Sequence, residues 1–208
     1  MALVTIGAQT WTVENLDVDS FRDGTPIAIA SSSRQWEQYA ASGTPACCYY
    51  DFDSANSRTY GRLYNWYAVS ASQELAPTGF RIPEKSDWDT LISTLGGERS
   101  AGLAMKNIQN WISLTRANPN GTNSSGFTGN PGGFIRDNGQ FYDLGFSGNF
   151  WADTTSSAAT AYSYKLYWEN NNAISISRTP LTIGLSVRLL VSGSESFSGD
   201  YNPSEPYQ

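Results

Sequence analysis

Alternating apolar and polar residues at both ends of the chain predict β-strands. Near the N-terminus, "LVTIGAQTWTVENL" alternates on both sides of Gly7, a pattern typical of two short strands joined by a turn. Near the other end, "GLSVRLLV" predicts a strand whose Leu185, Val187 and Leu189 share one face. The Asp-Asn-Gly run at 137–139 is a strong hairpin signal between "GFIR" and "QFYDLGF".

Helical spacing occurs in two segments of the first half. In "PEKSDWDTLISTLGG" apolar residues recur at i, i+3, i+4 and i+7 before a Gly-Gly pair, which predicts a helix with one buried stripe. Residues 31–41 have similar spacing, a Ser-rich start that can cap a helix, and Gly43 to end it. A shorter helix is expected near 101–106. The buried stripe consists of Trp88, Leu91, Ile92 and Leu95.

The order of these elements predicts an α+β fold in which two helices pack on short antiparallel strands with long loops. The sequence ends in "SGSESFSGDYNPSEPYQ", which is polar and rich in Pro and Gly. We therefore expect one domain over residues 1–191 and a polar tail or linker over 192–208. The 208 residues are 39% hydrophobic, enough for a core of their own. We expect that core to contain Trp11, Trp36, Trp66, Trp88 and Trp111.

The charge distribution argues against two classes of partner. Lysine and arginine form no cluster and the net charge is -6, so a nucleic-acid partner is not expected. No apolar run reaches membrane-spanning length, so membrane insertion is not expected either. "MALVTIG" lacks the basic and long apolar regions of a signal peptide, which suggests a virion or the cytoplasm as the location.

Residue types that perform catalysis are scarce. The chain has no histidine, the commonest general base and metal ligand, and no GxSxG motif. Cys47 and Cys48 are adjacent, so a disulfide between them would be strained, and we expect two thiols beside a strand. Asp51 and Asp53 could grip a divalent cation if they alternate on a strand, whereas a solvated loop is the other interpretation. The sequence predicts no catalytic residue, no metal site, no cofactor and no enzymatic activity.

Residues 149–183 differ from the rest of the chain in composition. They are crowded with Tyr, Trp, Asn, Ser and Thr and carry almost no charge. Tyr and Trp give large contact areas at low entropic cost, and Ser and Asn give adaptable hydrogen bonds, a mixture typical of binding loops. Tyr162, Tyr164, Tyr167 and Trp168 together exceed what the core side of one strand can bury. The segment is therefore predicted to be a recognition surface.

Five ordered blocks between Thr5 and Leu190 resemble the Fibrobacter succinogenes major paralogous domain family. The blocks are "TIGAQTWTVENLDVDSFRDGTPI", "YGRLYNWYAV", "LAPTGFRIPEKSDWDTLISTLGG", "SGFTGNPGGF" and "GFSGNFWADT…GLSVRLL". The resemblance implies a C-type-lectin-like fold, in the branch shared with formylglycine-generating enzymes. Many members resemble the variable proteins of diversity-generating retroelements, including phage receptor-binding proteins. In those proteins, error-prone reverse transcription randomises a late segment on a rigid scaffold.

This chain departs from the family pattern in three places. Members often have one cysteine in the block matching "LAPTGF" and another in the block matching "SVRLL", and this chain has neither. The helix-start position usually filled by Ser or Thr holds Glu84, which weakens the expected cap. Neither the calcium-binding sugar motif of true C-type lectins nor the catalytic cysteines of the formylglycine enzymes can be placed. Calcium-dependent lectin activity and oxidase activity are therefore not expected.

The resemblance also implies which late positions vary. Adenine-directed mutation of an Asn codon can give Ser, Tyr, Asp, Thr, Ile, Leu, Phe, Ala or Arg, but not Lys, Glu, Gln, Met or Trp. We therefore assign Trp151, Lys165, Trp168 and Glu169 to the scaffold. The candidate contact positions are Asn149, Phe150, Asp153, Tyr164, Tyr167, Asn170, Asn171, Ile174, Ile176, Arg178, Thr179 and Leu181.

Two isoleucines on this list have two interpretations. Alternation in "AISIS" points Ile174 and Ile176 inward, as core residues. The family pattern instead buries the residue matching Ala173 and leaves both isoleucines facing out. We expect them to be exposed, because exposed isoleucine pairs are typical of binding surfaces.

Together these features favour a non-enzymatic binding module that displays residues 149–183 to a cell-surface protein or glycan, as a phage receptor-binding protein does. The alternative is a structural or assembly protein of a virion or cell surface, with its aromatic face buried between subunits. The two are compatible, because a homotrimer can leave the binding face free.

Overall fold

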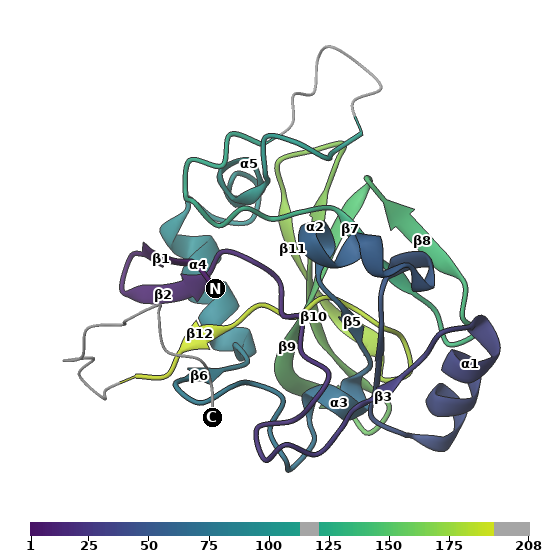
Figure 1. The fold of residues 1–208 in the computed structure, drawn as a ribbon. Coiled ribbons are helices and arrows are strands. Elements are labelled where there is room, and N and C mark those ends of the chain that lie inside the picture. Colours follow the sequence, from purple (N-terminus) through teal and green to yellow (C-terminus); the bar gives the residue numbers. More distant parts are fainter. Residues whose placement is uncertain (113–120, 194–208) are drawn as a thin grey trace.

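The computed structural model describes residues 1–112 and 121–193, which form an α+β fold with few helices and small, curled sheets (Figure 1). The α+β class predicted from the sequence is confirmed. Of the tail predicted over 192–208, residues 194–208 lie outside the described part. Among the described residues, no helix is long and apolar enough to span a membrane.

The first sheet joins the N-terminal hairpin to the last described strand, in the order β1-β2-β12-β6. Gly7 lies in the turn of the predicted hairpin with φ 60°. The predicted strand over 184–191 is shorter than expected, because residues before Leu190 make only single bridges, such as Leu185 to Tyr64. The strands are β1 (Leu3–Ile6), β2 (Gln9–Thr12), β6 (Phe80–Arg81) and β12 (Leu190–Val191).

The second sheet is the largest and contains most of the late segment. Its order is β11-β10-β9-β7-β8, so β11 forms one edge. The pairs β9–β10 and β10–β11 are antiparallel, whereas β7 meets β9 through one parallel bridge. The strands are β7 (Gly132–Ile135), β8 (Phe141–Leu144), β9 (Ser147–Ser157), β10 (Thr160–Tyr167) and β11 (Ala173–Pro180). The expectation of uniformly short antiparallel strands is thus wrong for β9, which has 11 residues, and for the parallel bridge.

A third, small sheet contains β3 (Ala28–Ile29), β4 (Ala46–Cys48) and β5 (Leu63–Tyr64). Cys47 and Cys48 are free, buried thiols on β4, as predicted, and burial raises the pKa of Cys47 to about 11. The "DFD" segment is not a strand, because Asp51 and Phe52 lie in a 3₁₀ turn over Tyr50–Phe52 that ends at Asp53. Asp51 and Asp53 are exposed there, so the loop interpretation is confirmed.

The two predicted long helices are present, α1 (Ser33–Ser42) and α4 (Lys85–Thr94). The Ser32 hydroxyl caps α1, and Gly43 ends it with φ 67°. The weak cap of α4 at Glu84 is supplemented by Asp87, whose carboxylate accepts from the Glu84 amide at 2.8 Å. The shorter helices are α2 (Ser57–Tyr60), α3 (Trp66–Val69) and α5 (Ala101–Met105).

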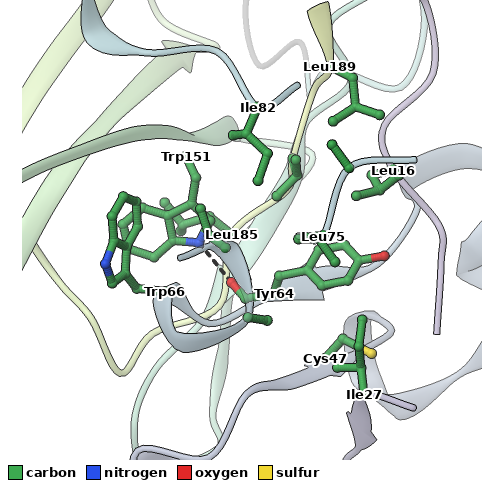
Figure 2. Packing of buried hydrophobic residues seen from close by; sticks show 14 of the residues in the cluster. Leu16, Ile27, Cys47, Tyr64, Trp66, Leu75, Ile82, Trp151, Leu185 and Leu189 are labelled. Carbon is green, nitrogen blue, oxygen red and sulfur yellow. Dashed lines mark hydrogen bonds between the residues drawn. The ribbon is translucent and has the colours of Figure 1, made fainter. Parts of the chain in front are cut away.

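Two of the core clusters flank the largest sheet. In the first, Trp66 and Trp151 meet with ring centroids 5.3 Å apart, and Trp151 Nε1 donates to the carbonyl of Tyr64 at 2.7 Å (Figure 2). Leu185, Val187 and Leu189 enter this cluster together, as their predicted shared face requires. The second cluster surrounds Trp88 between α4 and strands β9 and β10. The five tryptophans predicted in the core are all buried.

Candidate functional site

The late segment folds into an antiparallel hairpin of β10 and β11, which we call the late hairpin (Figure 1). One of its faces packs on the Trp88 cluster. Phe150 from β9, together with Tyr164 and Leu166 from β10, lies on that face and is buried. The opposite face is only partly covered, so the two faces give the candidate positions different environments.

Phe150 and Tyr164 are buried, so the expectation that they contact a partner directly is wrong. Phe150 is completely buried, and its ring centroid lies 5.6 Å from that of Trp88. Tyr164 stacks on Trp88 with ring centroids 5.0 Å apart, and its hydroxyl donates to Asp89 Oδ1 at 2.6 Å. Burial and this carboxylate raise the pKa of Tyr164. Both rings belong to the scaffold because α4 covers their side of the sheet.

The prediction that Asn149 and Thr179 contact a partner is also wrong, for a different reason. Each is buried, and each has a polar partner within the protein. The Asn149 amide nitrogen donates to the carbonyl of Gly133 at 3.1 Å and to Ser147 Oγ at 2.8 Å. Thr179 Oγ1 and Ser163 Oγ lie 2.7 Å apart and share a hydrogen bond. These side chains tie strands together, because the Asn149 amide nitrogen and the Thr179 hydroxyl both have partners within the protein.

The remaining eight candidates are at least partly accessible. Six of them lie on the late hairpin or its turn, and two lie elsewhere. Asp153 lines a separate pocket that includes Arg81 and Glu74, so the structure does not bring it to the other candidates. Leu181 packs partly against the first core cluster. The six are Tyr167, Asn170, Asn171, Ile174, Ile176 and Arg178.

Ile174 and Ile176 are neither fully buried nor fully exposed. Ala173 is 1% exposed, as the family pattern predicts, while Ile174 and Ile176 are half-buried. In the β10–β11 register Ile174 pairs with Lys165 and Ile176 pairs with Ser163, so both isoleucines share the face opposite the Trp88 cluster. Neither isoleucine is a fully buried core residue, and both present part of their apolar surface to solvent.

Ile176 and Arg178 line a pocket of about 200 Å³ on this face. Phe134 from β7 and Ile183 contribute to its floor, although neither was a candidate position. The signal for Phe134 was present in "GFIR", because alternation places it opposite the buried Ile135. Ile183 follows the hairpin and could not be placed by alternation.

The turn of the late hairpin is held against α5. Lys106 is 1% exposed, and its Nζ donates to the carbonyls of Tyr167 at 3.3 Å and Asn170 at 2.9 Å. Burial lowers the pKa of this ammonium group. Gly102 lies so close that a Cβ there would come 2.4 Å from the carbonyl oxygen of Asn172. The turn therefore has a fixed backbone, supported by two residues that sequence patterns did not single out.

The scaffold assignment of Lys165 agrees with its contacts. Its Nζ lies 3.2 Å from Asp143 Oδ2 and 4.8 Å from the ring centroid of Tyr167. Among the described residues, no three His, Cys, Asp or Glu side chains gather where they could hold a metal ion. The chemistry available on the free face is thus apolar contact, amide hydrogen bonding and the guanidinium of Arg178.

Two matched tyrosine variants test the division between buried and accessible candidates. Tyr164→Phe should lower the free energy of unfolding by about 1.5 kcal/mol, because it removes the hydroxyl that donates to the Asp89 carboxylate. Tyr167→Phe keeps its ring and should stay within about 0.5 kcal/mol of wild type. Urea denaturation of both proteins gives the comparison, and equal losses would contradict the assignment.

Comparison with known proteins gives one positive result. A family model described as the Fibrobacter succinogenes major domain matches residues 4–190, which is most of the chain and includes every candidate position. Comparison with curated proteins and with solved structures gives no match. The protein therefore belongs to the Fibrobacter succinogenes major domain family.

Proposed function

We propose that this protein is a non-enzymatic binding module with a C-type-lectin-like fold, which presents the late hairpin to a protein or glycan on a cell surface. In this proposal it is a variable protein of a diversity-generating retroelement, such as a phage receptor-binding protein. The observation that carries the proposal is the contrast between the two faces of the hairpin. One face is built into the core, while the other gathers accessible candidate positions on a fixed backbone.

A displayed surface must tolerate sequence change without loss of fold. The accessible candidates suit this requirement, because their side chains are at least partly exposed and other residues hold their strands. Among them, Asn170 also supports the turn, since its Oδ1 accepts from the Asn172 amide at 2.9 Å. The Trp88 stack on Tyr164 and the Lys106 bonds to the turn are two such supports, and neither uses an accessible candidate side chain. Affinity would come from desolvation of the tyrosine and isoleucines, with amide groups at the rim.

Two matched libraries test this proposal before any ligand is known. One randomises Tyr167, Asn170, Asn171, Ile174, Ile176 and Arg178, and the other randomises Asn149, Phe150, Tyr164 and Thr179. We expect most members of the first library to fold, with cooperative thermal unfolding close to wild type, and most members of the second to fail. Equal tolerance in the two libraries would argue against a displayed surface.

Two further measurements address the partner and the diversification. Simultaneous replacement of Tyr167, Asn171 and Ile174 by alanine should abolish binding to intact target cells while thermal unfolding is retained. The DNA around the gene should contain a near-identical template repeat and a reverse transcriptase gene. Unchanged cell binding by the triple variant would overturn the proposed surface, and a locus without the repeat would remove the retroelement from the proposal.

A further inference from the structure

The accessible side of the late hairpin continues across the sheet as one mixed apolar and cationic surface, which we call the β11 face. Cross-strand pairing fixes its membership, because paired residues project to the same side of a sheet. Lys165 pairs with Ile174, and Ser163 pairs with Ile176. The β11 face consists of Phe134, Lys165, Tyr167, Ile174, Ile176 and Arg178.

The pocket on the β11 face has the size of a side-chain anchor. Small-molecule sites usually enclose about 300–1,000 Å³. The pocket beside Ile176 has about 200 Å³ and lies on a sheet surface. It therefore suits one apolar side chain of a macromolecule, and the apolar walls of Phe134 and Ile183 favour an aliphatic or aromatic group.

The same surface borders an open strand edge. β11 is the terminal strand of its sheet, so half of its backbone N–H and C=O groups point away from β10. Its register with β10 is regular from Ala173 to Ile176 and becomes irregular only between Ile176 and Thr179. The Ala173 N–H already donates to the carbonyl of Glu98 at 2.8 Å, so the open part of this edge begins at Ser175. From there an added strand can pair with the backbone groups that point away from β10.

The charged groups on the β11 face indicate what kind of partner segment it binds. In the described part of the chain, Arg178 forms no ion pair, whereas Lys165 is paired with Asp143. Arg136 lies over the ring of Tyr142, 4.5 Å from its centroid, and also forms no ion pair there. These local cations fit an acidic segment of a partner.

We propose that β11 accepts an extended segment of a partner protein as an added strand, with an apolar side chain in the pocket and a carboxylate on Arg178. This inference rests on the proposed function and goes further, because it selects protein over glycan and names the segment's chemistry. Main-chain pairing with β11 from Ser175 onward would supply affinity, and the pocket and Arg178 would supply selectivity.

A displayed library of random peptides of about ten residues, the length of a strand, is the probe. Selection on the wild-type protein should enrich peptides that contain Asp or Glu near an aliphatic or aromatic residue. Selection on Arg178→Glu should enrich Lys or Arg instead, and acidic peptides should bind that variant at least about tenfold more weakly. Arg58→Glu is the matched control, since Arg58 is exposed on α2, outside the β11 face, and should select the wild-type set.

Backbone methylation of one selected peptide tests the strand addition itself. Two peptides are compared, one N-methylated at its odd-numbered residues and the other at its even-numbered residues. Only one of the two should lose binding, because only every second N–H of the peptide pairs with β11. The inference would be overturned if selection on the wild-type protein did not enrich Asp or Glu. It would also be overturned if both N-methylated peptides lost binding equally, or if neither did. Wild-type binding to glycans alone, lost in the triple alanine variant, would also overturn it while leaving the proposed function in place.

Discussion

Arg188→Met is expected to lower the free energy of unfolding by about 4 kcal/mol, the largest effect of any polar substitution in this fold. Arg188 is completely buried, and burial lowers its pKa to about 9, so the guanidinium remains charged at neutral pH. Within the described residues no carboxylate pairs with it. The charge is balanced by oxygen dipoles and by the face of an aromatic ring.

These dipoles come from parts of the chain that are far apart in sequence. Arg188 donates to the carbonyl of Thr12 at 2.8 Å, to the carbonyl of Phe127 at 2.6 Å and to Asn15 Oδ1 at 3.0 Å. Its guanidinium also lies 4.3 Å from the ring centroid of Phe127. Methionine fills similar space but leaves the buried acceptors unpaired, each at a cost of roughly 1–3 kcal/mol before relaxation.

Arg188→Lys serves as the chemical control for this prediction. Lysine keeps the positive charge but cannot reproduce the planar set of guanidinium donors. Arg188→Lys should therefore still lose more than half of the stability that Arg188→Met loses. Arg58→Met, at an exposed position, should change the free energy of unfolding by less than about 0.5 kcal/mol. Urea unfolding measures all three variants. A loss below about 1 kcal/mol for Arg188→Met would show that the buried hydrogen bonds are replaceable.

Trp88→Ala is expected to cost about 4 kcal/mol and to loosen the late hairpin as well as the core. Trp88 is completely buried, and its ring contacts aromatic rings from β2, β9, β10 and the segment before β7. Loss of the Trp88 ring leaves a cavity beneath Tyr164, because the two rings stack on each other in the wild-type protein. Amide hydrogen exchange should accelerate along β10 in this variant.

Trp88→Phe separates packing volume from aromatic character. It retains a ring against Tyr164 and should cost about half as much as alanine. Leu3→Ala, at a side chain that is 50% exposed on β1, should cost less than about 0.5 kcal/mol and leave β10 exchange unchanged. Thermal unfolding and amide hydrogen exchange measure these variants. If β10 stayed protected from exchange in Trp88→Ala, Trp88 would not support the late hairpin.

The elements predicted best from the sequence are those with local signals. Gly7, Gly43 and the Asp-Asn-Gly turn at 137–139 are all where the sequence predicts them, because turn and cap geometry depends on a few neighbouring residues. The strand predicted over 184–191 was wrong in extent, because its pairing depends on several distant partners. Arg188 could not be identified as a core residue, since nothing near it in sequence shows which carbonyls will surround it.

The location of the candidate site stays a prediction, and the structure separates its residues into buried and accessible ones. Codon reasoning separates residue types that can vary from those that cannot, and it says nothing of which side of a strand each one occupies. Phe150 and Tyr164 passed that filter and lie in the core, because α4 covers their face. Burial depends on what packs above a strand, and that information lies in the α4 sequence, far from the hairpin.

The pairing of the last described strand, β12, with β2 also affects when the sheet can form during synthesis. Leu190 pairs with Trp11, and Arg188 bonds to Thr12, so the scaffold lacks a boundary strand until residue 191 is available. At a synthesis rate of about 5–20 residues per second, the N-terminal hairpin waits roughly 10–40 s for its partner. Closure of this sheet therefore joins segments with a long sequence separation, a feature that slows folding.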